Sequence, residues 1–243
     1  MDRDLYLQWK EAAAHFDKGE ILVAFSLFMQ ISATAKLHFN VAACALRLGD
    51  IGTAILALQA ALKLDDYLGV AYLQLGYCYY LQGKFQDSLA QFLSAYKCIR
   101  GNIYVDYSQL GLPYELTAAH VWFNIGICQS KLNMQEAKHF YEKSCHILSH
   151  FKLSPLHRAD LQIISQTVKA TKLSAKAEIN ASPFCVPTCM IFKMSANLEN
   201  HMEKVDYLGK ANVLYDSLAN LHRSAILKVP PRTSSFEIDA ISA

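Results

Sequence analysis

Apolar and small residues recur along the first part of the chain with the spacing of paired α-helices. Within each stretch they fall three and four residues apart, which places them on one face of a helix. Gly49 and Gly83 lie where a first helix must end, because glycine tolerates the positive φ that helix C-termini often require. The pattern predicts four helical hairpins, at roughly 4–31, 34–64, 68–98 and 116–149.

The hairpins align with one another through their small residues. Ser88, Phe92 and Ala95 repeat the types found one hairpin earlier, and the frame returns at Ala137 and Tyr141. Small residues let two antiparallel helices approach, and a large residue one turn later fills the groove to the next pair. A helical hairpin with a period of about 34 residues resembles the tetratricopeptide repeat (TPR). We therefore expect an all-α fold, a TPR superhelix of four hairpins.

The C-terminal part changes character after the last hairpin. A helix at about 155–175 is expected to cover the exposed apolar face of the final repeat. Prolines at 183 and 187 exclude a long helix and favour an extended stretch. Because a TPR groove commonly accepts an extended peptide, residues 183–194 could occupy it. The expected domains are 1–175 (TPR and capping helix, with an insertion at 100–115), 176–201 (extended, packing back on the array), 202–220 (amphipathic) and 221–243 (disordered).

Composition excludes several classes of function. The net charge of +2 provides no strong field for nucleic acid, and no apolar run is long enough for stable membrane insertion. No signal peptide precedes the repeats, so a cytoplasmic protein is expected. An odd number of cysteines without a CxxC pair favours buried thiols over a disulfide framework; they are Cys44, Cys78, Cys98, Cys128, Cys145, Cys185 and Cys189.

No arrangement of residues indicates catalysis. His146 and His150 are one turn apart, but no acidic residue completes an HExxH motif. Cys185, Cys189 and His201 match no common zinc spacing. The sequence predicts neither an enzyme nor a bound cofactor or metal.

The repeat is interrupted after the third hairpin, at Arg100–Tyr107. Extra residues between units add nothing to stacking, so we expect a binding loop outside the core. The motif Arg100-Gly-Asn, followed by Asp106-Tyr107 and Leu110-Gly-Leu, resembles the insertion of the NADPH oxidase activator family. A second motif, Asp206-Tyr-Leu-Gly-Lys-Ala-Asn-Val213, resembles the family's activation segment. Both stand in register with the repeats, so the resemblance covers roughly residues 5–220.

The resemblance implies two partner sites. The insertion and neighbouring loops would bind a Rac-type small GTPase in its GTP form, through Arg100, Asn102, Tyr104, Asp106, Asp65, Tyr67 and Ala35. Ala35 and Tyr67 depart from the family's usual Ser and His. The activation segment would contact the NADPH oxidase flavocytochrome at the membrane, through Tyr207, Leu208, Gly209, Lys210 and Val213. An organiser subunit is a third family partner, although no SH3 or PB1 module is found in these 243 residues.

Other interpretations of the same residues stay open. Arg100 could simply cap the preceding helix, Asp106 could begin a turn, and 202–220 could be an ordinary amphipathic helix. The alternative function is a general TPR peptide-binding scaffold or co-chaperone that does not depend on a GTPase. Lys36 and Asn40 could begin a clamp for a chaperone's carboxylate, but the third repeat offers only Tyr72, Gln74 and Gly76.

Overall fold

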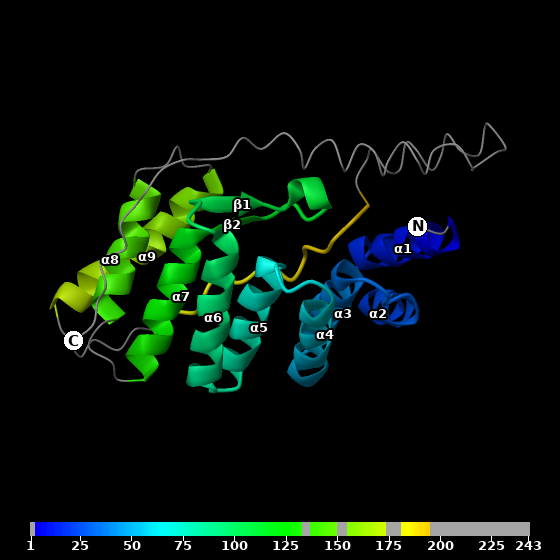
Figure 1. Cartoon of the computed structure of the whole chain (residues 1–243), viewed down its shortest axis with the longest axis horizontal. Helices are drawn as coiled ribbons and strands as arrows, with labels where there is room; N and C mark the ends of the chain where they lie inside the picture. Colours follow the sequence, from blue (N-terminus) through cyan, green and yellow to red (C-terminus); the bar gives the residue numbers. More distant parts are fainter. Residues whose placement is uncertain (1–2, 133–136, 150–154, 174–180, 195–243) are drawn as a thin grey trace, which may run out of the picture. The chain divides into compact units, whose positions relative to one another are not determined.

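The computed structural model describes residues 3–132, 137–149, 155–173 and 181–194. Helices dominate these ranges, and each packs most closely against its neighbours in sequence (Figure 1). Their bounds are α1 (Arg3–Asp17), α2 (Ile21–Gln30), α3 (Ala35–Arg47), α4 (Ile51–Leu64), α5 (Gly69–Leu81), α6 (Phe85–Ile99), α7 (Ala118–Lys131), α8 (Ala137–Ser149) and α9 (Pro155–Leu173). The predicted TPR fold class is confirmed. None of the helices in the described ranges has the length and apolar character needed to cross a bilayer.

Local sequence signals set the helix ends. The backbone N–H groups of Leu37 and Thr53 donate to the side chains of Thr34 and Asp50, which cap α3 and α4. Thr117 caps α7 in the same way. Gly49 and Gly83 adopt φ values of +79° and +72° after α3 and α5, as the sequence predicts.

Close approach at small residues holds the helix pairs together. A Cβ atom on Gly76 would lie 2.6 Å from the Phe92 ring, and one on Gly126 would lie 2.6 Å from the ring of Tyr141. The Ser88 hydroxyl donates to the carbonyl of Gly76 over 2.7 Å. The small and large positions that defined the repeat in the sequence are therefore the contact points between α5 and α6 and between α7 and α8.

The insertion is more ordered than the sequence predicts. It forms a hairpin of two antiparallel strands, β1 (Tyr104–Asp106) and β2 (Glu115–Thr117), with a 3₁₀ turn η1 (Ser108–Leu110) between them. The expectation that it lies outside the core is wrong, because three of its side chains, Tyr107, Leu112 and Tyr114, are buried in the main hydrophobic cluster. Leu116, next to it in β2, is buried in the same cluster. Backbone N–H groups of Gly69 and Val70 bond to the Tyr107 hydroxyl, while burial raises the pKa of Tyr107 to about 12.

Helix α9 covers the end of the array. Ile164 is fully buried and Val168 is buried with it, against Phe123 of α7 and Tyr141 of α8. This arrangement removes from water the apolar face that a terminal repeat would otherwise expose.

The close contact at Gly76 can be tested by substitution. Gly76→Ala should lower the free energy of unfolding by about 1–3 kcal/mol, because the new methyl group overlaps the Phe92 ring. Gly52→Ala is the matched control, since its Cβ would lie 3.5 Å from the nearest atom, in ordinary contact. Chemical denaturation of both variants measures the difference. Equal stabilities would show that the α5–α6 contact adapts without cost.

Candidate functional site

Residues 181–194 lie in extended form along the first helices of the repeats. They cross α7, α5 and α3 in turn, against the direction of the array (yellow in Figure 1). Val186, Ile191 and Phe192 of this tail are buried. The face formed by α3, α5 and α7, called the groove below because TPR proteins commonly hold a peptide on the equivalent helices, is thus occupied by a segment of the same chain.

Three side-chain amides hold the backbone of this tail. Asn124 on α7 donates to the carbonyl of Phe184 and accepts its N–H, both over 2.7 Å. Asn40 on α3 makes the same pair of bonds to Phe192, at 2.8 and 2.7 Å. Gln74 on α5 accepts the N–H of Val186 over 3.0 Å. An amide can donate and accept at once, so it suits a peptide backbone whose two polar groups both need partners.

The three amides occupy one position of the repeat. Gln74 lies one full repeat after Asn40, and Asn124 holds the same place in the repeat beyond the insertion. The sequence pattern indicates Asn40 only as the start of a possible carboxylate clamp, and it predicts no contact with the tail for Gln74 or Asn124. The signal in the sequence that could have indicated these positions is an amide side chain that recurs at the same place of each repeat on an otherwise apolar helix face.

Aromatic rings at both ends of the tail pack against rings of the helices. The Phe184 ring stacks on His120, with centroids 4.4 Å apart, and lies 5.1 Å from Phe123. The Phe192 ring meets Phe39 edge-on at 5.2 Å. His120 in turn pairs with Asp160 of α9 over 2.8 Å. The tail therefore connects the capping helix with the first repeats.

The carboxylate clamp is not present in this arrangement. Both amide atoms of Asn40 are bonded to Phe192. The Lys36 ammonium donates to the carbonyl of Leu110 over 2.7 Å. Burial lowers the pKa of Lys36, and the nearby negative charge of Asp65 partly opposes that shift. Both proposed clamp residues already have partners within the chain.

Three of the predicted GTPase-binding residues come together at one edge of the array. The Arg100 guanidinium lies 4.8 Å from the centre of the Tyr67 ring. Asp65 accepts the N–H of Tyr67 over 3.0 Å and so shapes the turn between α4 and α5. All three side chains are exposed, with Tyr67 at 63%. Arg100 also ends α6 with a left-handed φ of +53°, so its capping role is real.

The other predicted GTPase-binding residues have varied surroundings. Asn102 donates to the carbonyl of Ile99 over 2.9 Å, at the end of α6. Asp106 begins a turn, since it accepts the N–H of Ser108, and hydrogen bonds from Ser108 lower the pKa of Asp106. Tyr104 is exposed on β1, and Ala35 is half-buried at the start of α3. The residues assigned to oxidase activation, Tyr207, Leu208, Gly209, Lys210 and Val213, lie outside the described residues.

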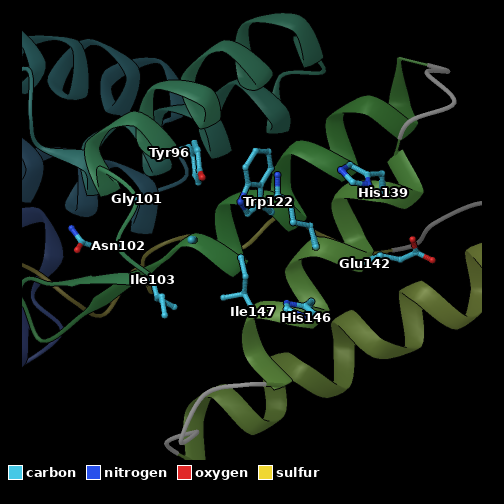
Figure 2. A pocket seen from close by; sticks show the side chains of 11 residues that line it. Tyr96, Gly101, Asn102, Ile103, Trp122, His139, Glu142, His146 and Ile147 are labelled. Carbon is cyan, nitrogen blue, oxygen red and sulfur yellow. The ribbon is translucent and has the colours of Figure 1, made fainter. Parts of the chain in front are cut away.

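A pocket of about 490 Å³ is lined by residues 101–103 and by side chains of α6, α7 and α8. Figure 2 shows Trp122 at its wall, with Tyr96 and Ile103 nearby. The Lys143 ammonium lies 4.1 Å from the centre of the Trp122 ring and gives this wall a positive charge. The pocket was not predicted from the sequence, because its walls come from three separate helices and the insertion.

The cysteines are free thiols, and Cys44, Cys78 and Cys128 are buried as expected. Cys189 is exposed, which the pattern did not predict. Burial raises the pKa of Cys78 to about 12 and that of Cys185 to about 11, so few thiolates form near neutral pH. Within the described ranges, His, Cys, Asp and Glu form no group of three suited to a metal ion. His150 and His201 fall outside those ranges.

Several known proteins are similar to this chain over most of its length. No family model matches the chain. NADPH oxidase activator 1 of Rattus norvegicus is 28% identical over 205 residues, or 84% of this chain. Neutrophil cytosol factor 2 of Bos taurus is 28% identical over 239 residues, or 95% of this chain. The predicted resemblance to the NADPH oxidase activators is confirmed.

The chain spans only part of these relatives, 43% of the length of each of the two mammalian proteins. An NADPH oxidase activator of Dictyostelium discoideum is also similar, at 22% identity over 191 residues, 76% of this chain and 29% of the relative. Among solved structures, the MamA protein matches 63% of this chain and 80% of its own, with a TM-score of 0.52 and 16% identity. At that identity the match concerns the fold alone.

The hold of the amides on the tail can be measured directly. Asn40→Ala leaves the buried N–H of Phe192 without its partner, at a cost of about 1–3 kcal/mol. If the tail opens and closes faster than it is cut, proteolysis within 181–194 should accelerate at least about fivefold. Gln59→Ala is the control, because its amide donates to the Tyr79 hydroxyl and not to the backbone of residues 181–194 within the described part of the chain. Equal cleavage rates in the two variants would contradict the role given to Asn40.

Proposed function

We propose that this chain is a non-enzymatic adaptor that binds a GTP-loaded Rac-type small GTPase and activates a superoxide-generating NADPH oxidase. Its relatives are named as activators of NADPH oxidase. The observation that carries the proposal is the exposed contact of Arg100 with Tyr67, beside Asp65. Catalysis belongs to the oxidase, and the adaptor acts by assembly.

The edge of the array has the chemistry of a protein-binding surface. Arginine and tyrosine are enriched among residues that dominate binding energy, and the guanidinium donates several hydrogen bonds in a rigid fork. Stacking over Tyr67 restricts the Arg100 side chain before any partner arrives. Part of the entropy cost of ordering this long side chain is therefore met within the free protein.

Dependence on GTP follows from the partner's chemistry. The γ-phosphate and its Mg²⁺ order the switch segments of small GTPases, which loosen after hydrolysis. A rigid surface such as the Arg100–Tyr67 edge discriminates between these states, because only the ordered one offers complementary contacts. The adaptor would move from the cytoplasm to the membrane-bound oxidase, where 202–220 meets the flavocytochrome and an organiser subunit supports assembly.

The alternative, a general peptide-binding scaffold or co-chaperone, is less well supported. Its expected site is the groove, where Asn40, Gln74 and Asn124 already bind the chain's own tail. An external peptide would have to displace a segment held by at least five hydrogen bonds from these amides. Arg100, Tyr67 and Asp65 are exposed with the tail in place, so a partner at this edge needs no such displacement.

A binding experiment tests the GTPase proposal. Immobilised Rac loaded with a non-hydrolysable GTP analogue should retain the protein, and Rac loaded with GDP should not. Arg100→Glu should weaken binding by more than about 2 kcal/mol, or about thirtyfold, while helical content by circular dichroism stays unchanged. Arg47→Glu is the matched control, because Arg47 also stacks on a ring, that of Phe16, at 5.0 Å. Equal or absent binding to the two nucleotide forms would overturn the proposal.

The activation segment is tested separately from GTPase binding. Val213→Ala should leave the affinity for GTP-loaded Rac intact and reduce superoxide output in a reconstituted membrane system. The expected loss reflects a smaller apolar contact with the oxidase, worth about 1 kcal/mol or roughly fivefold. Val229→Ala makes the same change outside the motif and should have no effect. Unchanged output from Val213→Ala would exclude this residue from the oxidase contact.

A further inference from the structure

The turn of the insertion hairpin is hydrogen-bonded to the end of the described tail. The N–H of Lys193 donates to the carbonyl of Gly111 over 2.8 Å. Gly111 has a φ of +94°, and a Cβ atom at this position would lie 1.9 Å from the Lys193 carbonyl oxygen. Backbone lies directly against backbone here, and no side chain larger than hydrogen fits between them.

Other elements hold Lys193 and the neighbouring tail residue Phe192. Trp9 of α1 donates its indole N–H to the carbonyl of Phe192 over 3.0 Å. Asp17, at the end of α1, pairs with the Lys193 ammonium over 2.7 Å. Lys36 of α3 donates to Leu110 of the hairpin and lies 5.7 Å from the centre of the Phe192 ring. The first helices, the hairpin and the tail therefore meet at one point.

This meeting point joins two features that the proposed function treats separately. The insertion that carries Gly111 between its two strands also contains the residues assigned to the GTPase from Arg100 to Asp106. The tail that ends at Lys193 continues in sequence to the segment assigned to the oxidase. We propose that Gly111 is a positioning residue, which anchors Lys193 to the insertion and so limits how far the activation segment can lie from the bound GTPase. This inference rests on the proposed function.

The number of residues between the anchor and the activation segment sets how much the loss of the anchor lowers the effective concentration of that segment. The tether to Tyr207 starts at Lys193 while the anchor holds, at Val186 if only the end of the tail is released, and at Leu173 if the tail detaches as far as α9. These tethers span about 14, 21 and 34 positions, and the effective concentration of a tethered segment falls roughly as the −3/2 power of tether length. The overlap at Gly111→Ala displaces the Lys193 backbone and with it the adjoining Phe192, which frees the end of the tail. The effective concentration should then fall about twofold if the tether starts at Val186 and about fourfold if it starts at Leu173.

The test separates anchoring from binding. In a reconstituted oxidase with GTP-loaded Rac, Gly111→Ala should raise the protein concentration for half-maximal superoxide output about two- to fourfold. The maximal output and the affinity for Rac alone should match the wild type, because neither partner site is changed. Cleavage within 181–194 by a protease should accelerate. A purely structural defect would instead lower the maximum or the Rac affinity.

A second test variant, Lys193→Pro, and two controls, Gly83→Ala and Lys193→Ala, separate the loss of the anchor from other effects of substitution. Gly83→Ala introduces the same strain at a left-handed glycine, φ +72°, but a Cβ there meets nothing within 4 Å. Lys193→Pro removes the N–H from the tail side and leaves the hairpin intact, while Lys193→Ala keeps that N–H and removes only the pairing with Asp17. Gly111→Ala and Lys193→Pro should both raise the protein concentration for half-maximal superoxide output, whereas Gly83→Ala and Lys193→Ala should leave it unchanged.

The possible failures are distinguishable. If Gly111→Ala and Lys193→Pro show the same half-maximal concentration as Gly83→Ala and Lys193→Ala, the anchoring role is overturned. If the wild-type protein itself neither binds Rac nor supports superoxide output, the proposed function fails instead. Faster proteolysis in the Gly111→Ala and Lys193→Pro variants with unchanged half-maximal output would show that the anchor exists but does not serve activation, and would equally overturn the inference.

Discussion

An extended segment buried in an apolar groove must find partners for its backbone N–H and carbonyl groups. In a sheet, neighbouring strands would provide them, but here the walls are helices whose own backbone groups are already bonded. Side-chain amides from Asn40, Gln74 and Asn124 meet the need instead, with Trp9 and the hairpin carbonyl of Gly111 at the far end. The course of the tail follows from the placement of these groups.

The same requirement explains why the insertion is well ordered. Its strands bond to each other, and its buried tyrosine and leucine side chains join the core of the array. The insertion can then carry both Arg100 at its start and the Gly111 carbonyl in the turn between its strands. Capping a helix and binding a partner are compatible roles for Arg100, because its backbone performs the first and its side chain is left for the second.

Prediction from sequence succeeded where the determining contacts are local. The hairpins, the capping helix and the glycine turns follow from periodicity, caps and backbone freedom within a few residues. It was incomplete for the insertion, since strands of three residues carry too little pattern to be recognised. The contact between Arg100 and Tyr67 could not be predicted from the sequence. The two residues lie on turns about one repeat apart, and only the stacking of the repeats brings those turns together.

The sequence by itself determined the repeat, its period and the small positions at which helices touch. These depend on side-chain size and spacing along a single helix pair. Only the tertiary structure decided that the groove is filled by residues 181–194, and that the insertion holds their end. Both outcomes depend on amides and a glycine that are far apart in the chain. Their hydrogen-bond partners are backbone atoms, which carry no mark in the sequence.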